Sequence, residues 1–146
     1  MMNEFSSARN QRRFVAERAN RCCEYCYSPR DFSPDPFSIE HIIPLVLGGT
    51  NHNENLAFSC QGCNNHKFTS RSAIDPVTGE TVPLYHPRLD EWSDHFTWSR
   101  DYQFIIGLTA KGRATVDRLR LNRDSVVNLR RVLYLTGEHP AVKLDH

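Results

Sequence analysis

Two cysteine pairs offer the clearest chemistry in the sequence. Cys23 and Cys26 are separated by two residues, and Cys60 and Cys63 repeat that spacing. A two-residue gap lets both sulfurs of one turn point at the same ion, and two such turns supply the closed four-thiolate set of a structural zinc site. The spacing therefore predicts one tightly held zinc ion per chain.

Two redox disulfides are the alternative use of these four cysteines. Neither pair lies in the strand–helix–strand context that is typical of thiol redox proteins. The opening residues, MMNEFSSARNQRR, lack the apolar core of a secretion signal, so we expect a cytoplasmic protein whose thiols stay reduced. A fifth cysteine, Cys22, fits the symmetric spacing less well than Cys23, and we expect it to be a small buried filler.

A second group of residues lies between and just after the two pairs. The run IEHIIP at residues 39–44 is followed by Gly48-Gly49, by Asn55-Leu56, and by CNNHK at residues 63–67. In order and spacing this set resembles the HNH endonuclease family, also called ββα-metal nucleases. The resemblance covers about residues 21–68, close to a third of the chain.

The resemblance implies a role for each matching residue. His41 is the general base that takes a proton from the attacking water, and Glu40 and Asn64 are the ligands of a catalytic divalent ion. Asn55 holds the loop and orients His41. Because Glu40 and His41 are neighbours on a strand, the backbone must twist there for both side chains to serve one site.

The chemistry of phosphodiester hydrolysis fits these residue types. The reaction needs an activated water, charge stabilisation at phosphorus and help for the departing oxygen. An imidazole of near-neutral pKa supplies the first, and a hard divalent cation supplies the others. An amide ligand at Asn64 favours Mg²⁺ or Mn²⁺ over zinc at this second site.

Basic residues indicate where a nucleic acid would bind. The net charge is only +1, but arginines gather between Arg9 and Arg21, and basic residues gather again between Lys111 and Arg131. Such clusters can neutralise phosphates. Beside the motif, Lys67, His66 and Arg71 are expected to contact the phosphate backbone. We expect DNA as the partner, with RNA left open.

The elements that must position these residues give an α+β fold. We expect a zinc-stapled ββα core at residues 21–72, with a strand at Phe37–Ile43 and a helix from Cys60 to about Ser70. A basic N-terminal segment at residues 1–20 precedes the core, with a short helix expected over Ala8–Asn20 and Ser6 or Ser7 as its cap.

A C-terminal α+β extension at residues 73–146 is expected to pack on the core. Its hairpin pairs His95–Ser99 with Gln103–Leu108, and two helices follow at Thr109–Leu121 and Asp124–Leu135. Six large side chains are expected to form a small second core: Trp92, Phe96, Trp98, Phe104, Ile105 and Ile106. No apolar run approaches the roughly 20 residues of a membrane span.

The leading hypothesis is a metal-dependent endonuclease. The main alternative is a non-catalytic zinc module that binds nucleic acid or a protein partner. Such a module has no need of a base beside two ligands for a second metal. The two hypotheses are therefore discriminated by the set Glu40, His41, Asn55 and Asn64. Cleavage specificity, biological pathway and oligomeric state are not readable from the sequence.

Overall fold

The computed structural model describes residues 4–140 and combines helices with three small sheets, which confirms the mixed α and β composition. The elements are α1 (Glu4–Arg18), β1 (Ser38–His41), β2 (Leu56–Ser59), α2 (Gln61–Lys67), β3 (Ser72–Ile74), β4 (Thr81–Pro83), α3 (Trp92–His95), β5 (Phe96–Trp98), β6 (Ile105–Gly107), α4 (Ala110–Leu119) and α5 (Asp124–Leu135). Short 3₁₀ turns lie at Arg30–Phe32, Leu45–Leu47 and Asn53–Asn55.

The strand pair β1–β2 and the helix α2 carry the motif residues. The two strands pair antiparallel, with Glu40 opposite Ala57 and His41 opposite Leu56. Cys60 then ends β2 and caps α2, because its Sγ accepts a hydrogen bond from the Cys63 amide at 3.4 Å. β1, β2 and α2 thus follow one another along the chain.

The C-terminal elements lie close to their predicted positions. β5 and β6 pair antiparallel, and α5 has the predicted bounds. Thr109 caps α4 by accepting a hydrogen bond from the Gly112 amide at 3.0 Å, as a threonine at this position does in many helices.

Two local predictions were wrong. α1 begins at Glu4, so Ser6 and Ser7 lie inside the helix and do not cap it. The expected helix through Ser70 ends at Lys67, and the chain turns directly into β3, which pairs with β4. The sequence of β3 is too short to show a period, and its partner strand supplies the hydrogen bonds that define it.

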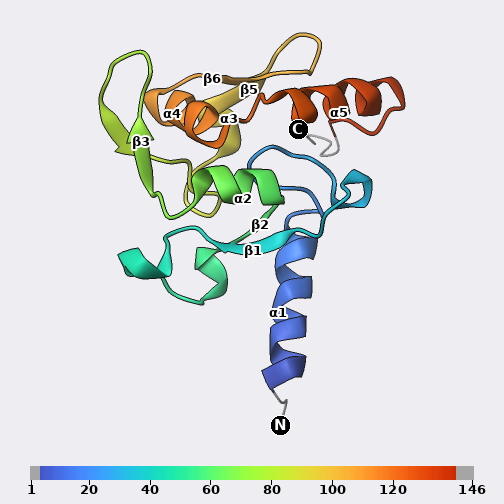
Figure 1. The fold of residues 1–146 in the computed structure, drawn as a ribbon, viewed down its shortest axis with the longest axis vertical. Coiled ribbons are helices and arrows are strands. Elements are labelled where there is room, and N and C mark those ends of the chain that lie inside the picture. Colours follow the sequence, from blue (N-terminus) through green and yellow to red (C-terminus); the bar gives the residue numbers. More distant parts are fainter. Residues whose placement is uncertain (1–3, 141–146) are drawn as a thin grey trace.

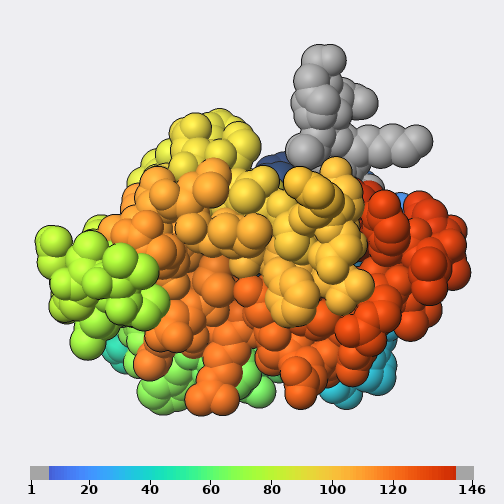
Figure 2. All heavy atoms as spheres, turned by 90° about the horizontal axis from the view of Figure 1, so that it is seen from above, coloured from blue at the N-terminus to red at the C-terminus, as the bar shows by residue number. Residues whose placement is uncertain are grey.

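The elements stack in layers (Figure 1). α1 projects away from the β1–β2 pair, and α2 lies between that pair and the C-terminal elements, in contact with both β1 and α4. Viewed from the side opposite α1, most of the surface is formed by the chain after β3 (Figure 2). The C-terminal extension thus covers one side of α2.

One hydrophobic core joins the two halves. The turns at residues 23–26 and 60–63, which carry the cysteine pairs, are called the knuckles below. Buried side chains in and beside them, such as Tyr25 and Phe58, belong to the same cluster as Phe96 and Leu119. The predicted separate second core is wrong, because Phe104 and Ile106 are 42% and 44% exposed. Alternation along the β5–β6 hairpin explains this, since neighbours of the buried Ile105 point outward.

Within residues 4–140, every helix is too short or too polar to span a bilayer.

Candidate active site and zinc centre

The four predicted thiols lie together. The Sγ atoms of Cys23, Cys26, Cys60 and Cys63 are all within 4.8 Å of one another, and the side chains are buried. All are free thiols, and the 3.6 Å between Cys26 Sγ and Cys60 Sγ rules out a disulfide between these two. A tetrahedral zinc ion with Zn–S bonds of about 2.3 Å would space its sulfurs about 3.8 Å apart. The cluster is therefore compatible with a structural zinc site.

Backbone amides orient these thiols. The amides of Tyr25 and Cys26 donate to Cys23 Sγ at 3.4 and 3.5 Å, and the Cys63 amide donates to Cys60 Sγ. Cys22 stays outside the cluster. It is buried, and that burial raises the pKa of its thiol to about 11, as suits the expected filler role.

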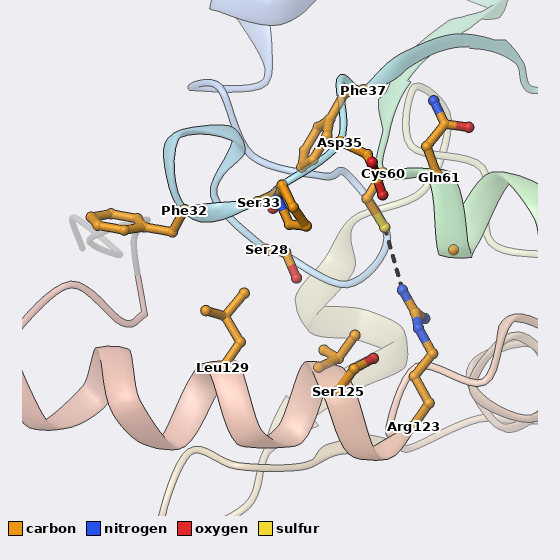
Figure 3. A pocket seen from close by; sticks show the side chains of 13 residues that line it. Ser28, Phe32, Ser33, Asp35, Phe37, Cys60, Gln61, Arg123, Ser125 and Leu129 are labelled. Carbon is orange, nitrogen blue, oxygen red and sulfur yellow. Dashed lines mark hydrogen bonds between the residues drawn. The ribbon is translucent and has the colours of Figure 1, made fainter.

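Two arginines from the C-terminal extension contact the knuckles. Arg123 donates from Nη2 to Cys60 Sγ at 3.4 Å and from Nη1 to Cys63 Sγ at 3.6 Å (Figure 3 shows the Cys60 contact). A Cβ at Gly62 would lie 2.5 Å from Arg123 Nη2, so a larger residue there would push the guanidinium away from its present position. Arg130, which is 2% exposed, donates to the Cys26 carbonyl oxygen at 3.2 Å.

A cavity of about 330 Å³ opens beside this cluster (Figure 3). It is lined by Cys60, Gln61 and Arg123 on one side, and by Phe32 and Leu129 on the other. The guanidinium of Arg123 closes the cavity toward the thiols. Its positive charge faces the thiolates that a zinc ion would require, and it offsets part of their negative charge.

The carboxylate of Glu40 is buried and held by two partners. Tyr25 donates its hydroxyl hydrogen to Glu40 Oε1 at 2.6 Å, and Lys67 Nζ lies 2.6 Å from Oε2. The side chains of Glu40 and Lys67 are only 4% and 1% exposed. Burial raises the pKa of Glu40, while the charge of Lys67 and the hydroxyl of Tyr25 act in the opposite direction.

Lys67 therefore does not lie where the sequence interpretation put it. Its ammonium points inward, donates to the Ile42 carbonyl oxygen at 2.9 Å and pairs with Glu40, so it does not face a nucleic acid. The cause is the packing of α2 across β1, which turns this face of the helix toward the strand. The sequence predicts a phosphate contact for Lys67 because it does not reveal that α2 packs against β1.

His41 stands at the end of β1 with its ring half-buried. Its Nε2 lies 2.8 Å from Asn51 Oδ1. Asn51 itself is exposed and lies in the polar loop after Gly48-Gly49. Among residues 4–140 no other hydrogen bond to the His41 ring is present.

Asn55 is buried and bonds to the loop backbone. Its Oδ1 accepts from the Ile43 amide at 2.8 Å, and its Nδ2 donates to the carbonyl oxygens of Ile43 and Thr50 at 3.0 and 2.8 Å. Gly49 packs against this clamp, where a Cβ would lie 2.9 Å from Asn55 Nδ2. Asn55 thus holds the loop, whereas the direct contact with His41 belongs to Asn51.

Asn64 and His66 lie on α2. Asn64 precedes Lys67 by three residues, so both share the helix face that contacts β1. Its side chain is half-buried and, among the described residues, makes no hydrogen bond. His66 is half-buried, and the pKa of its ring is lowered by burial and by the charges of nearby Arg123 and two further arginines, Arg118 and Arg120. Arg71 is exposed beyond the end of α2.

The donor set suits a hard divalent cation. Glu40 Oε2 is buried with the Lys67 ammonium as its partner, and Asn64 lies about one helical turn before Lys67 on α2. Carboxylate and amide oxygens are ligands that Mg²⁺ and Mn²⁺ prefer. The ammonium of Lys67 already neutralises the carboxylate, so a cation there would share Glu40 with it or displace it.

Sequence reasoning missed three residues at these sites. Tyr25 sits inside the first knuckle, and its role as donor to Glu40 depends on the fold. Asn51 had a signal, because it is a polar residue in the turn directly after Gly48-Gly49. Arg123 had none, since it lies far along the chain from the thiols.

Comparison with known proteins supports the resemblance. Residues 23–69 match the family described as HNH endonuclease, and this segment spans both knuckles and the residues around Glu40 and His41. Comparisons with curated proteins and with solved structures gave no match. The resemblance to the HNH endonuclease family is thereby confirmed over this segment.

Proposed function

We propose that the HNH segment at residues 23–69 is the catalytic part of an endonuclease that hydrolyses phosphodiester bonds in nucleic acid, with DNA as the first candidate. The main support is the arrangement of His41. His41 follows the buried Glu40 on β1, and the helix that carries Asn64 contacts this strand. In this proposal β1, β2 and α2 form the ββα core of the family.

The proposed reaction begins with a water molecule positioned beside His41. The imidazole removes a proton from this water as the oxygen attacks phosphorus, and the bond to the 3′ oxygen breaks. The products are a 5′-phosphate and a 3′-hydroxyl, whose oxygen takes up a proton. This assignment of the scissile bond follows the family resemblance.

A divalent ion at Glu40 and Asn64, Mg²⁺ or Mn²⁺, would stabilise negative charge on the phosphate and on the leaving oxygen. Tyr25 and Lys67 orient the Glu40 carboxylate and oppose the effect of burial on its pKa. The four thiols and their zinc hold the hairpin and α2 together. We assign Lys67 a positioning role in place of the phosphate contact.

Basic side chains around α2 are the proposed contacts for the nucleic acid. His66 and the exposed Arg71 lie on and just beyond this helix, and the exposed Arg118 and Arg120 lie at the end of the adjacent α4. Clustered guanidinium groups bind phosphates without reading the bases. This surface therefore favours binding that depends strongly on salt and weakly on sequence.

A cleavage assay tests the proposal. Zinc-loaded protein is incubated with supercoiled plasmid in Mg²⁺, in Mn²⁺ or without added divalent ions. We expect nicking that requires the ion and falls at least about 100-fold in His41→Ala, because general base catalysis contributes about 10²–10⁴ in rate. His52→Ala is the matched control, since His52 is exposed in the same loop and its side chain makes no hydrogen bond among the described residues.

The non-catalytic alternative makes a different prediction. A zinc module that only binds would retain plasmid in a filter-binding assay and leave it uncut in every metal, with His41→Ala indistinguishable from the parent. Retained cleavage in His41→Ala would remove the residue from the mechanism.

A further inference from the structure

The side chain of Asn51 contacts one nitrogen of the His41 ring. The Oδ1 atom of Asn51 lies 2.8 Å from His41 Nε2. A carbonyl oxygen accepts hydrogen bonds and cannot donate them, so this contact suits a neutral ring that carries its proton on Nε2. The lone pair then lies on Nδ1, which has no hydrogen-bond partner within residues 4–140.

The loop that carries Asn51 is anchored on both sides. From α1, Gln11 Nε2 donates to the Asn51 carbonyl oxygen at 3.1 Å and to Asn53 Oδ1 at 3.0 Å. From the hairpin, Asn55 Nδ2 donates to the Thr50 carbonyl oxygen at 2.8 Å. An exposed asparagine in a free loop would sample many rotamers, whereas the contacts to the carbonyl oxygens of Asn51 and Thr50 fix the backbone from which Asn51 reaches the ring.

We propose that Asn51 is the positioning residue for His41: it accepts the Nε2 hydrogen, fixes the ring orientation and presents Nδ1 as the atom that takes the proton from water. This inference rests on the proposed function for the chemistry at Nδ1. The contact between the two side chains can be tested without any substrate. A hydrogen bond at Nε2 holds the ring in one orientation before the substrate binds. The ring therefore needs no further ordering when Nδ1 takes the proton, as in other sites where a neighbour fixes a histidine tautomer.

Three variants separate positioning from a general structural role. Asn51→Leu removes the acceptor at similar size. Asn51→Asp keeps an oxygen in the same place. Asn53→Ala is the matched control. The Asn53 side chain also accepts a hydrogen bond from Gln11, but it makes none with His41. Zinc content and thermal unfolding of each variant establish that the fold is intact.

The first measurement is the His41 tautomer in zinc-loaded protein, read from the ring nitrogen shifts in long-range ¹H–¹⁵N spectra above neutral pH. In the parent, in Asn51→Asp and in Asn53→Ala we expect nearly pure Nε2–H imidazole. In Asn51→Leu we expect a mixture of tautomers, as for a solvated ring. A parent ring protonated on Nδ1, or spectra that do not change in Asn51→Leu, would overturn the proposal.

The second measurement is plasmid cleavage under saturating substrate. We expect kcat to fall about 10- to 100-fold in Asn51→Leu with KM nearly unchanged, because misorientation of one reacting group costs rates of this order. Asn51→Asp should recover most of this loss, and Asn53→Ala should stay within about twofold of the parent if only the contact with His41 matters. An active Asn51→Leu protein overturns the assignment of Asn51 while leaving the nuclease proposal standing. A parent protein that never cleaves refutes the nuclease instead, and the tautomer spectra still decide whether Asn51 positions the ring.

Discussion

The buried pair of Lys67 and Glu40 allows a quantitative prediction. Replacing Lys67 with methionine keeps a long unbranched side chain but removes the ammonium beside Glu40 Oε2. The carboxylate then stays in a site where its side chain is only 4% exposed, with the Tyr25 hydroxyl as its remaining partner. The Ile42 carbonyl oxygen also loses its charged donor.

The expected cost follows from this burial. Removing one partner of a buried ion pair destabilises a protein by about 3–5 kcal/mol, because the other charge is left uncompensated. Glu40 can escape part of that cost by taking up a proton, since burial already raises its pKa and the opposing charge of Lys67 is gone. The destabilisation should therefore shrink as the pH falls, by at most about 1.4 kcal/mol per pH unit.

Urea unfolding of the zinc-loaded protein at several pH values measures the effect. Glu40→Gln, Lys67→Met and the double variant complete a cycle, in which we expect the double variant to be more stable than the sum of the two single losses predicts. Zinc content should match the parent throughout, since the thiols are separate from this pair. Strict additivity, or a loss below about 1 kcal/mol at pH 8 in Lys67→Met, would refute the description of Lys67 as the neutralising partner of Glu40.

Three further predictions concern the loop, the zinc centre and the C-terminal tail. Asn55→Leu should cost about 2–4 kcal/mol in urea unfolding, because two backbone carbonyls and an amide lose their partner; an unchanged midpoint would contradict the clamp. Arg123→Gln should release zinc to a chelator about 10-fold faster, with Arg123→Lys in between, whereas equal rates would show that the guanidinium does not stabilise the thiolates. His139 is buried against Trp98, and its burial lowers the pKa of the ring. The stability it contributes is present above pH about 6.5 and is lost as the pH falls through the lowered folded value, so His139→Gln should have a melting temperature that depends less on pH between 7 and 5.

Local patterns were sufficient to predict the four-cysteine cluster and the hairpin and helices after residue 95. The repeated cysteine spacing defines its own geometry, and Thr109 carries the side chain that a helix start requires. The apolar period in Asp124–Leu135 likewise needs no knowledge of the partners that α5 packs against. In each case the residues that indicate the feature are within a few positions of the residues that form it.

Other features depend on contacts between distant segments. The burial of Lys67 follows from the packing of α2 against β1. Arg123 contacts Cys60 and Cys63 although it lies 63 and 60 residues after them in the sequence. Asn55 was expected to orient His41, yet its side chain is fully used by the backbone of residues 43 and 50. Sequence spacing alone does not show that Lys67 is buried or that Arg123 contacts the thiols. Nor does it show which asparagine of the loop contacts His41.

The central claim is that the imidazole of His41 takes a proton from water during phosphodiester hydrolysis. Chemical rescue of His41→Gly by added imidazole tests it most directly, in a plasmid nicking assay with Mg²⁺ and zinc-loaded protein. The account predicts that the variant is inactive alone and that its rate rises with the concentration of neutral imidazole, while the parent rate does not. A His41→Gly protein that cleaves without imidazole would contradict the account, as would one that imidazole cannot restore although its zinc content and folding match the parent.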